Sequence, residues 1–185
     1  MVNAVLRVGA EPIFSDIDEE TFGSSSISIA HCITTNTRMI VAQHSFGIPC
    51  NIEAISSLAK REGIFLLEDC ALTLGSKVNR SIVGNFGDAA LFSTDHSKPL
   101  NTLTGGLVYS LNKNLIDQLC IEQEKFEDLS IKRQKALWRQ LRLEAKYCVP
   151  NRYGRIRLID AVAGLSKGLN LLSKDFLDDD FGIAT

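Results

Sequence analysis

The chain has 185 residues, of which 45% are hydrophobic and 23% are charged, and its formal net charge at pH 7 is −2. This composition is ordinary for a globular domain with one core, and the small charge gives no electrostatic reason to bind nucleic acid or an anionic membrane. No apolar run approaches the ~20 residues needed to cross a bilayer, and residues 1–9 lack the layout of a signal peptide. We therefore expect a cytoplasmic protein that binds neither nucleic acid nor a membrane.

The five cysteines and three histidines are scattered along the chain. The cysteine count is odd, and no two cysteines stand at the C-x-x-C spacing of metal and redox motifs. A disulfide framework and a zinc site are therefore not expected. We predict reduced, buried thiols and no bound metal.

The first half of the chain predicts alternating helices and strands. Gly9 favours the end of a helix over residues 2–8, and Asn51 can cap a helix that runs to about residue 61 before Gly63. The pattern also predicts a short helix over residues 27–33 and strands over residues 12–17, 38–42, 64–67, 89–93 and 106–110.

The strand, helix, strand order predicts an α/β fold with a mostly parallel sheet flanked by helices. The strands are apolar throughout, so we expect both faces of the sheet to be covered. Ligands of such sheets bind beyond the carboxyl ends of the strands. Asp69 and Ser93 both stand at such ends.

The character of the chain changes beyond Asn112. Residues 114–146 are charged and helix-prone, Pro150 interrupts them, and a second helical stretch is predicted over residues 157–172. We predict a large-domain portion over residues 1–112 and a helical region over residues 113–185. This region is either a separate lobe or a C-terminal domain cut short.

The most informative stretch is Phe92-Ser93-Thr94-Asp95-His96-Ser97-Lys98, followed by Gly105-Gly106. It resembles the DegT/DnrJ/EryC1/StrS family of pyridoxal-phosphate enzymes, which are mainly nucleotide-sugar aminotransferases. The family pattern places a lysine five residues after a Phe-Ser serine, and a Gly-Gly pair seven and eight residues after the lysine. Lys98 meets each of these spacings.

Further segments resemble the same family in the same order. They are residues 4–18, His44-Ser45-Phe46-Gly47, Glu68-Asp69-Cys70-Ala71 and Gly84-Asn85-Phe86-Gly87-Asp88. Together the motifs cover about residues 2–110. The resemblance implies the large domain of a pyridoxal-phosphate-dependent transferase of fold type I, which is the aspartate aminotransferase-like fold.

The resemblance also implies roles for individual residues. Lys98 would hold pyridoxal 5'-phosphate, because a neutral lysine amine forms a Schiff base and can then move protons. The cofactor needs a carboxylate beside its ring nitrogen, for which Asp69 is the candidate, and a donor to its phosphate, for which Ser93 is the candidate. The structural alternatives are a solvated lysine, a turn-capping aspartate and a serine that ends its strand.

Two further side chains have a weaker assignment. His44 stands at a strand end that should face the cofactor, so it is either a cofactor contact or a packed turn histidine. Asp88 is expected to be structural. Glu68 precedes Asp69 and is expected to point to the other side of the chain.

Some positions depart from the family pattern. Leu72 and Leu74 stand where the family has polar or histidine side chains near the cofactor, and Thr104 replaces an acidic residue before the Gly-Gly pair. Val2 matches a position just after an N-terminal family segment that holds a phosphate-binding Gly-Thr turn and an aromatic over the cofactor ring. We therefore expect a truncated chain.

The resemblance implies transfer of an amino group, from glutamate by family analogy, to a keto group of a nucleotide-linked sugar. The pathway class would be surface polysaccharide or amino-sugar biosynthesis, and the active enzyme would be a homodimer with its active site between the subunits. The alternative is a catalytically incomplete remnant that acts as a binding or structural module. Related sugar dehydratases replace the lysine by histidine, so Lys98 argues against dehydration.

Overall fold

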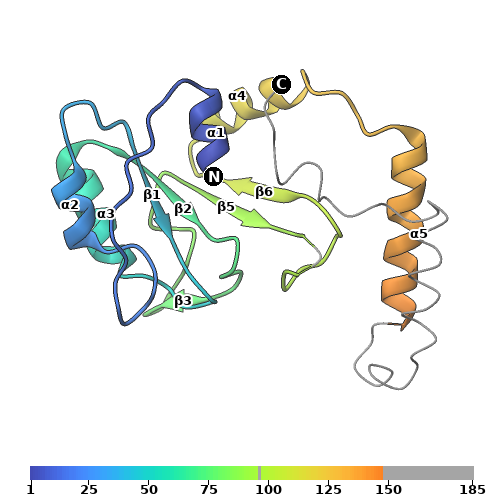
Figure 1. Cartoon of the computed structure of the whole chain (residues 1–185), viewed down its shortest axis with the longest axis horizontal. Coiled ribbons are helices and arrows are strands. Elements are labelled where there is room, and N and C mark those ends of the chain that lie inside the picture. Colours follow the sequence, from blue (N-terminus) through green and yellow to red (C-terminus); the bar gives the residue numbers. More distant parts are fainter. Residues whose placement is uncertain (96, 148–185) are drawn as a thin grey trace. The chain divides into compact units, whose positions relative to one another are not determined.

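The computed structural model describes residues 1–95 and 97–147, and the chain divides into two compact units after Lys125. The first unit (Figure 1) contains α1 (Val2–Arg7), α2 (Ser26–Cys32), β1 (Met39–Gln43), α3 (Ile52–Glu62), β2 (Phe65–Asp69), β3 (Lys77–Val78), β4 (Ser81–Ile82), β5 (Ala89–Ser93), β6 (Gly106–Tyr109) and α4 (Lys113–Gln123). In the second unit the described helix is α5 (Ile131–Tyr147). The division into compact units falls after Lys125, and the domain boundary predicted at residue 112 stays a prediction.

The main sheet of the first unit has four strands in the order β1-β2-β5-β6. The strands β1, β2 and β5 run parallel, and β6 runs antiparallel to β5 (Figure 1). The register places Gln43 opposite Asp69, and Asp69 opposite Leu91. The carboxyl ends of the three parallel strands therefore meet at one edge of the sheet.

The predicted helix before β2 is confirmed, and its ends show why it forms there. The Asn51 side chain accepts a hydrogen bond from the Ala54 amide and caps α3. Gly63 ends the helix in the left-handed conformation, at φ 64°, which glycine adopts without strain. The predicted helices at residues 2–8 and 27–33 also form, as α1 and α2.

The core packs α2 and α3 against one face of the sheet. In β1 and β2 the buried residues alternate with more exposed ones, and all four residues of β6 are exposed. The expected cover on both faces of the sheet is therefore incomplete within the described residues. The buried members of this core are Ile29, Ile40, Ala42, Cys50, Ile52, Ile55, Leu58, Ala59, Ile64 and Leu66.

The strand predicted over residues 12–17 is wrong. Only Ile17 forms a bridge, to Ser24, and the side chains of Ile13 and Phe14 are 65% and 75% exposed. An apolar run becomes a strand only where a neighbour completes its backbone hydrogen bonds. Within residues 1–95 and 97–147 no such neighbour pairs with this segment.

Other differences concern shorter features. The hairpin β3–β4 was not predicted; Asn79 lies in its two-residue turn with a φ of 54°, a conformation that asparagine tolerates. The helix-prone stretch over residues 114–146 forms two helices, α4 and α5. The predicted break at Pro150 and the helix over residues 157–172 lie outside the described residues. In the described part of the chain, no helix combines the length and apolarity needed to cross a membrane.

Candidate active site

The carboxyl edge of the sheet brings Asp69 and Ser93 onto the same face. Asp69 ends β2 and lies directly opposite Leu91 of β5 in the parallel register. Ser93 ends β5, two residues after Leu91, and side chains two residues apart on a strand point to the same side. Both side chains are half-buried. The register thus brings two residues that are 24 positions apart in the sequence to one corner of the sheet.

The Asp69 carboxylate is only partly engaged within the fold. Its Oδ1 accepts a hydrogen bond of 3.1 Å from the Ala71 amide, so the turn-capping alternative describes one of its two oxygens. From the described residues no other hydrogen bond reaches this carboxylate. The second oxygen is therefore available to a protonated ring nitrogen, which is the chemistry predicted for this position.

The lysine loop joins β5 to β6 at the same edge. It begins at Thr94, and the Lys98 amide donates a 2.9 Å hydrogen bond to the Asp95 carbonyl. The Lys98 side chain is half-buried, and among the described residues its ammonium group forms no ion pair. The Ser93 hydroxyl oxygen accepts from the Asp95 amide at 3.4 Å, which leaves its proton free to be donated to an anion.

The two ends of the lysine loop are joined by hydrogen bonds centred on Thr94. Its amide donates to the Gly105 carbonyl at 3.0 Å, its carbonyl accepts from the Thr102 amide at 2.9 Å, and the two threonine hydroxyls are 2.7 Å apart. Gly106 then pairs with Ser93 in the β5–β6 ladder. A Cβ at Gly106 would lie 2.7 Å from the Phe92 carbonyl oxygen, so this position has no room for a side chain. The Gly-Gly pair therefore lets the chain return close to β5 after Lys98.

Glu68 points to the opposite face of β2 from Asp69, as expected, and is fully buried. Its Oε1 accepts from the amides of Phe86 and Gly87 at 2.7 Å and 2.6 Å, and its Oε2 accepts from the Gly84 amide at 2.8 Å. The Gly-x-x-Gly turn thus wraps around a carboxylate. Burial by itself raises the pKa of Glu68, but the hydrogen bonds from His44 and from these amides together hold the pKa below its ordinary value.

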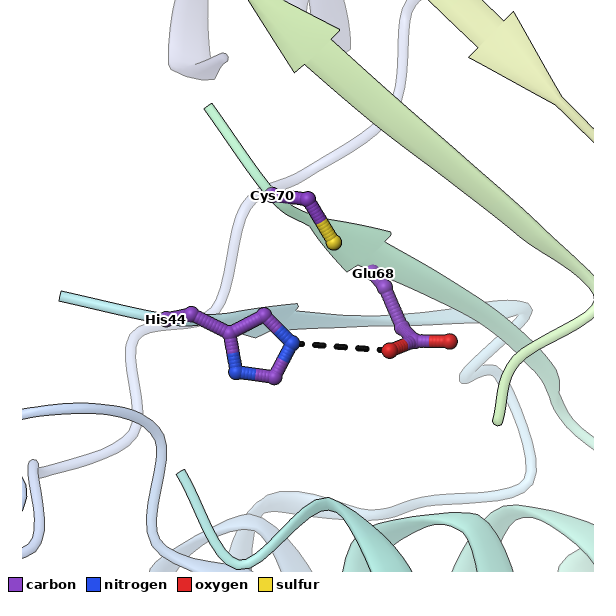
Figure 2. A group of neighbouring side chains, drawn as sticks. All are labelled: His44, Glu68 and Cys70. Carbon is purple, nitrogen blue, oxygen red and sulfur yellow. Dashed lines mark hydrogen bonds and ion pairs between the residues drawn. The ribbon is translucent and has the colours of Figure 1, made fainter. Parts of the chain in front are cut away.

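His44 lies beside Glu68 on the buried side of the strand ends (Figure 2). Its Nδ1 accepts from the Cys50 amide at 3.1 Å, and its Nε2 lies 3.5 Å from Glu68 Oε2. Because Nδ1 accepts, the neutral ring carries its proton on Nε2 and donates it toward Glu68. This geometry supports the packed turn histidine, and a direct cofactor contact by His44 stays a prediction.

Cys70 completes a buried group with His44 and Glu68, whose ligand-type atoms all lie within 4.8 Å of one another (Figure 2). The histidine tautomer argues against a metal there. A metal-binding imidazole usually donates from its other nitrogen, whereas His44 Nδ1 accepts a hydrogen bond, and Nε2 would have to lose its proton to bind an ion. Burial, followed by the charge of Glu68, also raises the pKa of the Cys70 thiol to about 12, which disfavours a thiolate ligand.

Asp88 has the structural role that was expected. Its Oδ2 accepts from the Leu66 amide at 2.7 Å, and its own amide donates to the Leu66 carbonyl at 2.8 Å. The turn that surrounds Glu68 is thus also tied to the start of β2. The predicted free thiols are present at Cys32, Cys50, Cys70 and Cys120, whereas Cys148 lies outside the described residues. The predicted burial is confirmed for Cys50 and Cys70 and is wrong for Cys32, which is half-buried, and for Cys120, which is exposed.

Comparison with known proteins assigns this arrangement to a family. The model of the DegT/DnrJ/EryC1/StrS aminotransferase family matches residues 1–165. The chain belongs to this family. The motifs cover about residues 2–110, whereas the family match continues to residue 165 and so includes residues 113–165 of the predicted helical region.

Individual members of the DegT/DnrJ/EryC1/StrS family are similar over about two thirds of the chain. A GDP-perosamine synthase of Escherichia coli O157:H7 is 41% identical over 133 residues, which are 72% of this chain and 36% of that protein. A crystal structure of DesI with its TDP-sugar product is 30% identical, with a TM-score of 0.64 over 69% of this chain and 32% of that one. The chain spans about a third of the length of the curated relatives it matches.

A further solved structure that is similar to this chain contains the predicted cofactor. The E. coli GDP-4-keto-6-deoxy-D-mannose-3-dehydratase with bound hydrated PLP is 27% identical, with a TM-score of 0.59 over 63% of this chain and 30% of that one. The similarity to these solved structures confirms the predicted fold, a mostly parallel sheet flanked by helices.

Sequence reasoning gave Glu68 no role, although the pattern contained a signal for it. A charged residue in an otherwise apolar strand, at a position whose alternate neighbours are buried, must find partners inside the fold. The Gly-x-x-Gly-Asp turn supplies the amides, but only the folded chain shows that the turn and the glutamate meet.

Proposed function

We propose that the protein is a pyridoxal-phosphate-dependent aminotransferase that acts on a nucleotide-linked keto sugar. The observation that supports this most directly is the shared edge of the sheet, which holds Asp69, Ser93 and the Lys98 loop together. In this proposal Lys98 would hold the cofactor, Asp69 would pair with its ring nitrogen, and Ser93 would donate to its phosphate.

The residues at this edge fit the cofactor chemically. Asp69 offers an oxygen that no described residue engages, and Ser93 offers a hydroxyl proton. When bound, pyridoxal phosphate supplies an electron sink that stabilises negative charge on the substrate carbon. The negative charge of Asp69 would favour a protonated ring nitrogen, and the Lys98 amine would move a proton within the site.

The substrate class rests on the relatives. The names of similar proteins include a GDP-perosamine synthase, a UDP-linked glucosamine 3-aminotransferase and a dTDP-linked glucose 4-aminotransferase. A nucleoside diphosphate sugar with a keto group is the common element. The proposal includes glutamate as amino donor and a homodimer, both by family resemblance, and a cytoplasmic location.

The second candidate function is a module that does not catalyse amino transfer by itself. The observation that favours it concerns two side chains that follow β2. Leu72 and Leu74 are 39% and 42% exposed and offer no hydrogen bond to a cofactor.

Cofactor capture separates the two candidates. The purified chain is saturated with pyridoxal phosphate, its visible absorbance is recorded, and the product is reduced with borohydride and mapped by mass spectrometry. We expect a visible band and a modified Lys98. The band should disappear in Lys98→Ala and persist in Lys60→Ala, which removes an exposed lysine of α3. Adding glutamate should then bleach the band, as expected of an amino donor.

Absence of the band at saturating cofactor, or modification spread evenly over the lysines, would contradict the enzyme proposal. Either result would leave the second candidate as the function of this chain. A band on Lys98 that glutamate does not change would retain cofactor binding and refute glutamate as the donor.

A further inference from the structure

Asp69 is held through its main chain more than through its side chain. The His44 amide donates to the Asp69 carbonyl at 3.2 Å, and the next amide, that of Cys70, donates to the Leu91 carbonyl at 2.9 Å. Among residues 1–95 and 97–147, the carboxylate itself receives one hydrogen bond, from the Ala71 amide. Its position at the sheet edge therefore depends on what fixes residues 68–70 and His44.

The buried Glu68 carboxylate belongs to the segment of residues 68–70 and lies beside the His44 ring (Figure 2). On one oxygen it holds the Phe86 and Gly87 amides, and on the other it holds the Gly84 amide and the Nε2 edge of His44. Four donors thus converge on a side chain that is 0% exposed and directly precedes Asp69. Buried polar groups of this kind fix geometry, since each donor left without an acceptor is costly.

We propose that Glu68 is a positioning residue for the cofactor site: with His44 it fixes the end of β2, so that the Asp69 carboxylate is held on the opposite face. This inference rests on the proposed function for its catalytic meaning. The structural part of the inference, that Glu68 fixes the position of Asp69, does not depend on the cofactor. Glu68 acts from the side of the sheet that the cofactor does not occupy, and it does not touch the reacting atoms.

The test uses the full chain and two readouts. The first is amide hydrogen exchange at His44 and Ala71, the two amides that bond to Asp69, measured relative to the Leu58 amide inside α3. The second is the dissociation constant for pyridoxal phosphate from an absorbance titration. Glu68→Gln keeps the size but turns one acceptor oxygen into an NH2 group, so two of the four donors lose their acceptor in either amide orientation.

In Glu68→Gln we expect amide exchange at His44 and Ala71 to accelerate about tenfold relative to Leu58. We expect the affinity for pyridoxal phosphate to fall about tenfold, the size of effect seen when residues that orient the direct ligands of a binding site are replaced. Ser56→Ala is the matched control. Ser56 donates to the Phe86 carbonyl at 2.7 Å, so the control loosens the same turn from the α3 side without touching Glu68. It should leave the relative exchange rates and the cofactor affinity unchanged.

A pair of His44 variants keeps the proposal testable if Glu68→Gln does not fold. In His44→Gln the amide nitrogen replaces Nε2 and can still donate to Glu68, whereas in His44→Asn the amide oxygen replaces Nδ1 and keeps only the Cys50 contact. His44→Gln should therefore retain the wild-type exchange at Ala71 better than His44→Asn.

The outcomes separate the two proposals. Unchanged relative exchange in Glu68→Gln, an equal effect of Ser56→Ala, or the reverse order of the His44 pair would overturn the positioning role. A wild-type chain that takes up no pyridoxal phosphate would defeat the proposed function, while the exchange data would still decide the role of Glu68.

Discussion

Replacing Gly106 by alanine tests the geometry that returns the chain to β5 after the lysine loop. The added Cβ would lie 2.7 Å from the Phe92 carbonyl oxygen and 3.9 Å from the Ser93 Cα. Both neighbours are backbone atoms of β5, and Gly106 is itself paired with Ser93. The clash therefore cannot be relieved by a side-chain rotation, and β6 has to move away from β5.

The expected cost follows from two opposing terms. Overpacking of this kind costs ~1–3 kcal/mol. The loss of glycine freedom in the unfolded chain stabilises the variant by ~0.4–1 kcal/mol. We expect a net loss of about 1–2 kcal/mol in the free energy of unfolding, which at a urea m-value of about 2 kcal/mol/M lowers the urea midpoint by roughly 0.5–1 M.

The assay is urea unfolding followed by circular dichroism, with cofactor retention as a second measurement. Gly63→Ala is the control, because nothing lies within 4 Å of a Cβ there and its cost arises from a φ of +64°, at the opposite edge of the sheet. Both variants should lose about 1 kcal/mol or more, but only Gly106→Ala should lose visible cofactor absorbance. A Gly106→Ala protein as stable as wild type would refute the close approach of β6 to Phe92.

Three further outcomes are expected. Hydrogen bonds hold the pKa of Glu68 below its ordinary value of 4.5, so the folded protein binds fewer protons than the unfolded chain as the pH falls toward and below that value. The urea midpoint should therefore decrease as the pH falls through the pKa of Glu68 in the folded protein. A urea midpoint that stays constant would contradict this prediction. Burial raises the pKa of the Cys50 thiol to about 12, so Cys50→Ser should leave the number of fast-reacting thiols in a thiol-reagent assay unchanged. Cys120 is exposed, and Cys120→Ser should lower that number by one. Thr102→Val removes the hydroxyl that lies 2.7 Å from the Thr94 hydroxyl, and it should lower the free energy of unfolding by about 1 kcal/mol and accelerate proteolysis of the lysine loop. An unchanged digestion rate would show that this hydrogen bond does not hold the ends of the loop together.

Local signals in the sequence were sufficient for most of the elements. The Asn51 cap and the Gly63 end predicted α3, and the apolar runs predicted β1, β2 and β5, because capping and short-range hydrophobicity act over a few residues. The strand over residues 12–17 failed for the complementary reason. Its stability depends on a neighbouring strand, and the described residues do not provide one.

The motif residues were predicted in the same way. Lys98 and the Gly-Gly pair lie within one loop, so their spacing is a property of the chain itself, and the family assignment by motifs agrees with the family match over residues 1–165. The roles of Lys98, Asp69 and Ser93 stay predictions that the cofactor experiments test.

The family and the position of the lysine loop follow from residues that lie close together along the chain, as do most of the helices and strands, although the β3–β4 hairpin was missed. Which side chains share a face is visible in the folded chain alone, because it depends on the register between strands that are distant in the sequence. The parallel register places Asp69 and Ser93 on one side of the sheet. The same alternation buries Glu68 on the other side, where the amides of a turn 16 to 19 residues away become its partners.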